Sequence, residues 1–220
     1  MNAQDVIDVL EEFVSENKQT QIERVLKQRT KHVTLVFEDI DKPHNVSAVL
    51  RTAECMGIQD LHFIKNRNSY SVNPLITQGA AKWVSLNHYD ERDNNVSSCF
   101  DSLRKDGYKV YATSLHETSR SIYDLDPNDK TAIVFGTEAD GITKEVGGKA
   151  DGFVHIPMGG FTESFNLSVS AAICLTVLKS KLIEWPKLSN EEQLELRALW
   201  YRKIEREADL ILKTKGVLNE

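Results

Sequence analysis

This sequence has few cysteines and lacks an apolar run long enough to cross a membrane. The three cysteines, Cys55, Cys99 and Cys174, lie far apart without a Cys-x-x-Cys pair, so we interpret them as buried free thiols and predict no metal site. The longest apolar stretch, residues 167–178, is short and contains serine. Residues 1–13 carry acidic side chains where an export signal carries positive charge. We therefore predict a cytoplasmic protein that does not enter a membrane.

An excess of positive charge is also missing. The chain has 27 Lys and Arg against 33 Asp and Glu, a net charge of -6 and a pI of about 5.6. This balance argues against a protein that coats nucleic acid nonspecifically, because such binding depends on neutralising phosphates. One segment, residues 15–32, has five basic side chains: Lys18, Arg24, Lys27, Arg29 and Lys31. It is either a solvated face or a local nucleic-acid contact.

Two common nucleotide-binding signatures are absent. No G-x-G-x-x-G follows the first predicted strand, so a dinucleotide fold is unsupported. The loop FGTEADGIT has two glycines spaced as in a phosphate loop, but Ile142 replaces the lysine. Glu138 and Asp140 would also repel a phosphate. Such a loop suits a ligand that is cationic or rich in hydroxyl and amino groups, and S-adenosylmethionine is compatible with it.

Apolar residues recur with strand and helix periods along most of the chain. Runs rich in β-branched residues predict strands at residues 32–39, 60–64, 83–86, 108–115, 131–135 and 152–156. Helical spacing predicts helices within residues 3–28, 45–57, 94–105, 164–184 and 189–215, the last starting at the capping box SNEE. Strands that alternate with helices favour an α/β fold, with a mostly parallel sheet and helices on both faces.

We divide the chain into three parts. Residues 1–30 form an N-terminal helical extension, residues 31–184 an α/β domain, and residues 185–220 a C-terminal helical extension that begins at Trp185-Pro186. The last helix carries an apolar stripe made of Leu196, Trp200, Ile204, Ala208 and Ile211. We expect this stripe to pack against the domain or against a second subunit.

The segment HNVSAVLRT predicts the start of a helix with Asn45 as its N-cap. His44, Ser47 and Arg51 have a spacing that places them on one helix face, opposite the apolar stripe. Arg51 is either an ordinary exposed arginine or a group that grips an RNA phosphate. In IPMGGFTESFNLSVSAA, a glycine-rich loop leads to Ser164 and Asn166 at a helix N-terminus. These two residues either cap the helix or bind the polar edge of a ligand.

These motifs together resemble a known family. In order and separation, NVSAVLRTAECMGI, AIVFGTEADGIT and HIPMGGFTESFNLSVSAAICL are similar to the three motifs of the TrmH (SpoU) family in the SPOUT superfamily, the RNA 2'-O-ribose methyltransferases. The similarity covers about residues 30–180. It implies a C-terminal trefoil knot, a homodimer, and S-adenosylmethionine as the cofactor.

The resemblance also implies roles for individual residues. The catalytic positions of the family fall on Arg51, Asn45, Glu138, Ser164 and Asn166. The cofactor-binding positions fall on Thr113, Gly136, Ile156 and Phe165, of which the last is usually leucine in the family. We expect RNA contacts from Arg24, Lys27, Arg29 and His44.

The implied activity is methyl transfer to a ribose 2'-hydroxyl of RNA. The terminal helices are similar to the branch that modifies a guanosine in the tRNA D-loop. A methyltransferase acting on ribosomal RNA and a non-catalytic RNA-binding protein of the same fold remain alternatives. A phosphate-loop nucleotidase is disfavoured, because the loop has no lysine.

Overall fold

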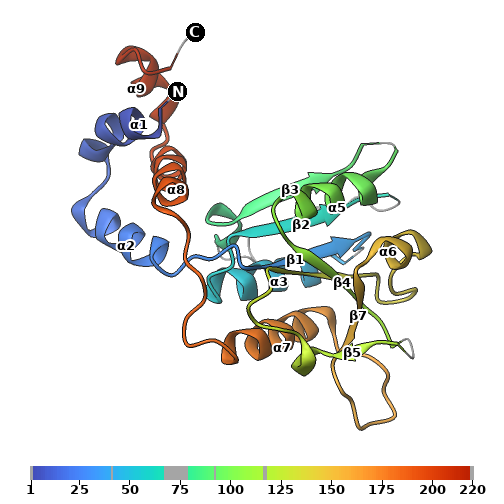
Figure 1. Cartoon of the computed structure of the whole chain (residues 1–220). Helices are drawn as coiled ribbons and strands as arrows, with labels where there is room; N and C mark the ends of the chain where they lie inside the picture. The colour runs from blue at the N-terminus through green and yellow to red at the C-terminus, as the bar shows by residue number, and fades with distance from the viewer. Residues whose placement is uncertain (1, 41, 67–78, 92, 116–117, 219–220) are drawn as a thin grey trace. The chain divides into compact units, whose positions relative to one another are not determined.

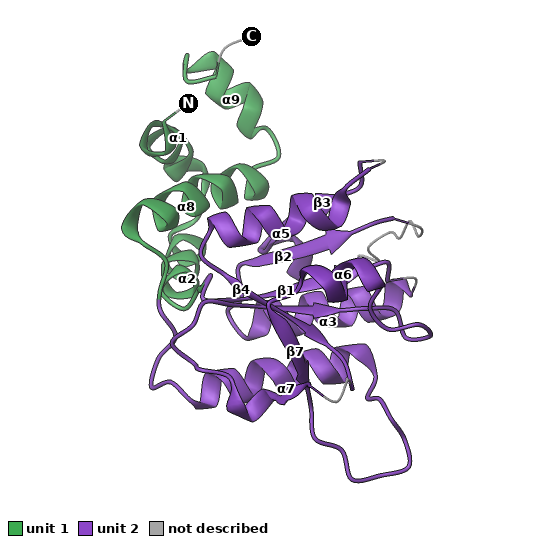
Figure 2. Cartoon of the chain, turned by 45° about the vertical axis from the view of Figure 1, so that its right-hand side comes forward, with its two compact units in different colours: residues 1–30, 187–220 green, residues 31–186 purple. Residues whose placement is uncertain are grey.

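The computed structural model describes residues 2–40, 42–66, 79–91, 93–115 and 118–218. They form two compact units (Figure 2): one contains residues 31–186, and the other combines residues 1–30 with residues 187–220. None of the helices in these ranges has the length and apolar character that crossing a bilayer requires.

The larger unit is built around one parallel sheet of seven strands in the order β3-β2-β1-β6-β4-β7-β5 (Figure 1). The strands are β1 (Val33–Glu38), β2 (Asp60–Ile64), β3 (Ser85–Tyr89), β4 (Lys109–Thr113), β5 (Arg120–Ser121), β6 (Thr131–Phe135) and β7 (Gly152–His155). The predicted α/β class with a parallel sheet is therefore confirmed. The trefoil knot stays a prediction.

Helices cover both faces of this sheet, as predicted. Helices α3 (Pro43–Cys55) and α7 (Leu167–Ser180) pack on one face, and α5 (Asn95–Lys105) and α6 (Lys144–Lys149) on the other. Short 3-10 helices lie at η2 (Ala80–Lys82) and η3 (Ile122–Asp124). Successive residues of a strand point to opposite faces, so every residue of β1 is buried on one side or the other.

The register brings the carboxyl ends of the central strands to one edge of the sheet. Phe37 pairs with Phe135 across β1 and β6, and its ring stacks on the rings of Phe135 and Phe63. Thr113 of β4 pairs with Val154 of β7. The segments that follow β1, β6, β4 and β7 therefore start beside one another, at the edge where parallel α/β sheets bind ligands.

The smaller unit is helical and joins the two ends of the chain. It contains α1 (Ala3–Leu10), η1 (Glu11–Phe13), α2 (Glu16–Leu26), α8 (Asn190–Ile204) and α9 (Ala208–Thr214). Helix α8 packs against α1 and α2, which bury Leu196 and Trp200 of the apolar stripe. The first part of the stripe is thus covered by the N-terminal helices of the same chain, a partner that the sequence pattern did not indicate, whereas Ile204 and Ile211 are half-buried.

The boundaries of three helices differ from the predicted ones, and one of them, α7, ends at Ser180 instead of residue 184. The last predicted helix is interrupted at Glu205, whose ψ of 120° is extended, so α8 and α9 are separate. The capping box at Ser189 and Glu192 is present as predicted. Helix α3 begins at Pro43 with Lys42 as its N-cap, so the prediction that Asn45 caps this helix is wrong. Proline favours the first helical position because its fixed φ already suits a helix.

Candidate active site

The glycine loop after β6 closes into a small hairpin. The N–H of Thr137 donates to the carbonyl oxygen of Gly141 at 3.0 Å, and the N–H of Gly141 donates back to Thr137 at 3.0 Å. Gly141 has a φ of +68°, in the left-handed region that favours glycine. A Cβ on Gly136 would lie 2.0 Å from the carbonyl oxygen of Gly141, so only glycine fits there. The hairpin presents residues 138–140 to solvent.

The hairpin places Glu138 against the start of α3. The side-chain amide of Asn45 donates to Oε1 of Glu138, and the ammonium of Lys42 forms an ion pair with Oε2. Asn45 is 5% exposed, so its amide is held between the two motifs. Two of the three motifs thus meet through a direct side-chain contact.

Asn166 brings the third motif to the same point. Its Nδ2 donates to Oδ1 of Asn45 at 3.2 Å. Its own Oδ1 accepts from the N–H of Ser168 at 2.9 Å, which makes Asn166 the N-cap of α7. The residue therefore caps the helix and also contacts Asn45, whereas its binding of the polar edge of a ligand stays a prediction. Ser164 is exposed in the segment that leads into α7.

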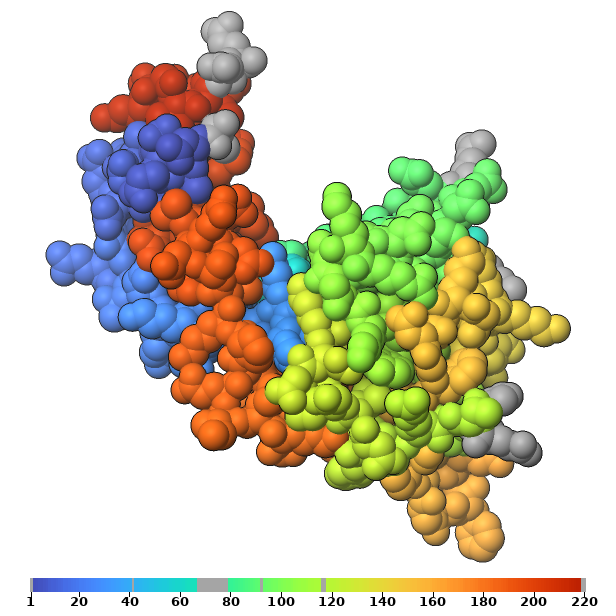
Figure 3. All heavy atoms as spheres, viewed as in Figure 1, coloured from blue at the N-terminus to red at the C-terminus, as the bar shows by residue number. Residues whose placement is uncertain are grey.

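The residues expected to bind the cofactor lie along the adjacent sheet edge. Thr113 ends β4, Gly136 follows β6, and Ile156 follows β7, and these strands are neighbours in the order β6-β4-β7. Thr113 Oγ1 donates to the carbonyl oxygen of Val134 at 3.0 Å, and Ile156 packs against the core. Phe165 is 42% exposed at the end of a segment that protrudes between β7 and α7 (Figure 3).

Arg51 lies on a different face of α3 from Asn45. It is exposed, and six residues separate the two, which is a rise of about 9 Å along the helix axis. His44 is also exposed and lies on the same helix face as Arg51, as predicted. Ser47 is fully buried, so the prediction that this face lies opposite the apolar stripe holds for His44 and Arg51 but is wrong for Ser47. Ser47 is buried because helix α3 packs against α7 as well as against the sheet, so a larger part of its surface is covered.

The residues expected to contact RNA divide into exposed and buried ones. Arg24 and Lys27 are exposed at the C-terminal end of α2. Arg29 is only 1% exposed, and its guanidinium lies 5.4 Å from the ring centroid of Trp200. The expectation that Arg29 contacts RNA is therefore corrected: the cationic side chain stacks on the buried indole within the smaller unit.

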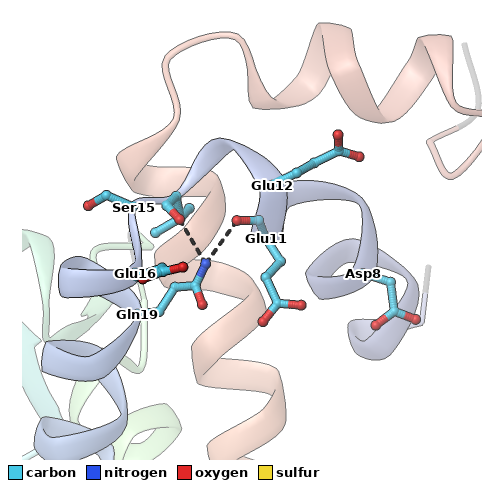
Figure 4. Close-up of a pocket in the computed structure, with 7 residues that line it drawn as sticks. Asp8, Glu11, Glu12, Ser15, Glu16 and Gln19 are labelled. Carbon is cyan, nitrogen blue, oxygen red and sulfur yellow. Dashed lines mark hydrogen bonds between the residues drawn. The ribbon is translucent and has the colours of Figure 1, made fainter.

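An acidic pocket limits where phosphates can approach the smaller unit. Asp8, Glu11, Glu12 and Glu16 line it together with Val14, Ser15 and Gln19 (Figure 4). The amide of Gln19 donates to the carbonyl oxygens of Glu11 and Val14, which fixes the turn between α1 and α2. The four carboxylates repel phosphate. An RNA contact at the basic end of α2, where Arg24 and Lys27 are exposed, stays a prediction.

Sequence reasoning missed two side chains at this site, Lys42 and Glu38. Lys42 pairs with Glu138, and 96 residues separate them along the chain. Glu38 accepts two hydrogen bonds from Thr143 at the end of the glycine loop. The acidic residue that closes a buried strand was the available signal for Glu38, since a carboxylate is rarely buried without a partner.

A model of the SpoU rRNA Methylase family matches residues 32–176, which include all three motifs and all seven strands of the sheet. This chain belongs to the SpoU methylase family. The membership confirms the predicted resemblance and the prediction that the chain is an RNA methyltransferase.

Relatives of this SpoU-family chain extend over almost its whole length. It is 41% identical over 202 residues to the tRNA (guanosine(18)-2'-O)-methyltransferase of Borreliella burgdorferi, covering 90% of each chain. The solved structure of the A. aeolicus TrmH/SpoU tRNA modifying enzyme matches with a TM-score of 0.67 and 26% identity, covering 93% of this chain and 98% of that one. The SpoU methyltransferase AviRb from Streptomyces viridochromogenes, solved in complex with AdoMet, shares the fold at a TM-score of 0.60 and 19% identity, over 72% of this chain and 63% of that one.

Proposed function

We propose that this chain is a tRNA guanosine-2'-O-methyltransferase that uses S-adenosylmethionine. The observation that carries the proposal is the meeting of three separate motifs at one point, where Asn45 contacts both Glu138 and Asn166. The relative from Borreliella burgdorferi, which bears that activity in its name, matches this chain over 90% of both lengths. The 202 matched residues exceed the length of the larger unit, so the match extends into the terminal helices, which supports a shared substrate class.

The residues at the sheet edge fit a cofactor without phosphate. The hairpin carries Glu138, which favours a cationic ligand, and Ile142 stands where a phosphate loop has lysine. The exposed ring of Phe165 offers an apolar surface for an adenine. Thr113, Gly136 and Ile156 would border the cofactor along the ends of β4, β6 and β7. When bound, S-adenosylmethionine supplies a methyl group that its sulfonium activates for transfer.

The chain's own residues have to position the ribose and manage a proton. The 2'-oxygen must come within about 3 Å of the methyl group, in line with the sulfur, which is mainly a task of orientation. Arg51 is suited to bind an adjacent RNA phosphate and to stabilise negative charge on the oxygen, because a guanidinium keeps its proton. Glu138 is a candidate to accept the proton or to orient Arg51. Ser164 and Asn166 would hold the polar edge of a ligand at the start of α7.

Further parts of the proposal concern partners and location. RNA contacts come from the exposed Arg24, Lys27 and His44, so the N-terminal extension acts through the end of α2. The protein works as a homodimer in the cytoplasm. Residues 31–184 then form the methyltransferase domain, and residues 1–30 and 185–220 form the extensions around it.

The activity is tested with radiolabelled S-adenosylmethionine and total RNA from cells that lack 2'-O-methylation of tRNA. We expect label in tRNA, mapped to a guanosine of the D-loop by nuclease digestion and mass spectrometry. Label confined to ribosomal RNA would overturn the choice of tRNA. Absence of label in every RNA, with the cofactor bound, would favour a non-catalytic RNA-binding protein.

Arg51→Ala tests the proposed division of roles. We expect it to abolish methylation and to leave the binding of S-adenosylhomocysteine, measured by titration calorimetry, nearly unchanged. Cys55→Ala is the matched control, because Cys55 is exposed on the same helix and has no proposed role. An equal loss of methylation and cofactor binding in Arg51→Ala would contradict the assignment.

A further inference from the structure

A buried carboxylate anchors the far end of the glycine loop. Glu38 is the last residue of β1 and is 1% exposed. Its Oε2 accepts from the backbone N–H of Thr143 at 2.9 Å, and its Oε1 accepts from the Thr143 hydroxyl at 2.6 Å. Both carboxylate oxygens thus bind one residue, which fixes the orientation of Thr143 as well as its position.

Thr143 also fixes the start of α6, the helix that follows the loop. Its hydroxyl accepts from the N–H of Val146 at 3.2 Å and so caps the N-terminus of α6. One hydroxyl therefore donates to Glu38 and accepts from α6 at the same time. The connection joins the end of β1 to the start of α6 through a single side chain.

The two ends of the glycine loop are held by the same strand. At its start, Phe135 pairs with Phe37 of β1. At its end, Thr143 is bound by Glu38, the residue after Phe37. Between these anchors the tip of the loop is exposed, so burial contributes little to its position. The anchors and the hairpin bridge are what aim Glu138 at Asn45.

We propose that Glu38 is a positioning residue for methyl transfer, which acts through Thr143 and the glycine loop to hold Glu138 in place. This inference rests on the proposed function. Glu38 touches neither Asn45 nor Asn166 in the described hydrogen bonds, so its effect on the reaction is indirect. No family motif quoted above contains it.

The surroundings of Glu38 make its hydrogen bonds necessary. Burial raises the pKa of the Glu38 carboxyl above its usual value, and the two hydrogen bonds from Thr143 oppose this shift. The neighbouring acids Asp39 and Glu145 raise the pKa further. The ionised form is the one that accepts two hydrogen bonds. Removal of either donor would therefore leave a buried carboxylate without enough partners.

Glu38→Gln is the direct test, because it keeps the shape and removes one acceptor. With tRNA and S-adenosylmethionine saturating, we expect kcat to fall at least about tenfold, as small displacements of a reacting group do. The Kd for S-adenosylhomocysteine should stay within about threefold of wild type, since the contacts at β4 and β7 are intact. Glu145→Gln is the matched control, which removes a nearby negative charge without touching Thr143.

Substitutions at the partner and in the loop separate positioning from folding. Thr143→Ser keeps the hydroxyl and should retain activity, whereas Thr143→Val should resemble Glu38→Gln. In a Glu138→Gln background, Glu38→Gln should cause no further loss of kcat, because both changes act on one group. Fully additive losses, or equal losses in Thr143→Ser and Thr143→Val, would overturn the proposal.

Hydrogen exchange distinguishes this inference from the proposed function. In Glu38→Gln, the amides of Thr137 and Gly141 should exchange faster than in wild type, while those of β2 stay unchanged. If wild type methylates no RNA, the proposed function fails, and faster exchange at the hairpin still supports the positioning role. Unchanged exchange at the hairpin overturns the role of Glu38 whether or not the protein is active.

Discussion

Gly136→Ala should open the hairpin that carries Glu138. The added methyl group would lie 2.0 Å from the carbonyl oxygen and 2.1 Å from the carbonyl carbon of Gly141, and 2.4 Å from the nitrogen of Ile142. All three neighbours are backbone atoms, so no rotation of a side chain relieves the overlap. The loop itself has to move away from Gly136.

The expected loss of stability follows from the hydrogen bonds that the loop loses. Opening the hairpin breaks the two hydrogen bonds between Thr137 and Gly141. Each hydrogen bond contributes about 0.5–1.5 kcal/mol, so the expected loss in the free energy of unfolding is about 1–3 kcal/mol. The tip of the loop is exposed, so the sheet does not need to rearrange. The variant should therefore fold with Glu138 displaced from Asn45.

Urea unfolding followed by circular dichroism measures the stability, and calorimetry with S-adenosylhomocysteine measures cofactor binding. Gly148→Ala is the matched control, because a Cβ at Gly148 in α6 meets nothing within 4 Å. It should be neutral or stabilising, since glycine in a helix costs about 1 kcal/mol relative to alanine. Wild-type stability together with wild-type affinity in Gly136→Ala would refute the reasoning.

Two predictions concern buried titratable groups. Burial lowers the pKa of His62 to about 4 from 6.5 in the unfolded chain. The unfolded state then binds more protons between these values, so stability is complete above pH 6.5 and falls by about 3 kcal/mol toward pH 4. His62→Gln should flatten this dependence in urea unfolding, and an unchanged slope would exclude His62 as its source. Ellman's reagent should label the exposed Cys55 in the folded protein, whereas Cys99 and Cys174, whose pKa values burial raises to about 12, should react only in urea. Labelling of a second thiol at the rate of Cys55 would contradict their burial.

The secondary structure could largely be predicted because the central strands β1 and β6 are fully buried and rich in apolar residues. The strands at residues 60–64 and 131–135 have the predicted bounds. The two-residue strand β5 is too short to leave a periodic signal. The break at Glu205 was missed because the apolar spacing continues across it. The order of the strands could not be obtained from local patterns, because β6 pairs with β1 across most of the domain.

The candidate site shows the same division between local and long-range information. The three motifs marked Asn45, Glu138 and Asn166, but nothing in their spacing shows that they touch, since 93 residues separate the first two and 121 the outer pair. For Arg29, the local pattern led to a wrong prediction. Its charge and basic neighbours predicted an RNA contact. Instead, the side chain is buried against Trp200, which lies 171 positions further along the chain (200 minus 29).

The pairing of α1 with α8 also sets an order of events during synthesis. Helix α1 is made long before α8, which covers Val6, Ile7 and Leu10 together with α9. Residues 31–186 form a continuous stretch that can complete its own contacts in the meantime. The apolar face of α1 therefore stays uncovered on the ribosome until α8 has been made. Chains that stop before residue 190 would expose this face permanently and become targets for chaperones or proteases.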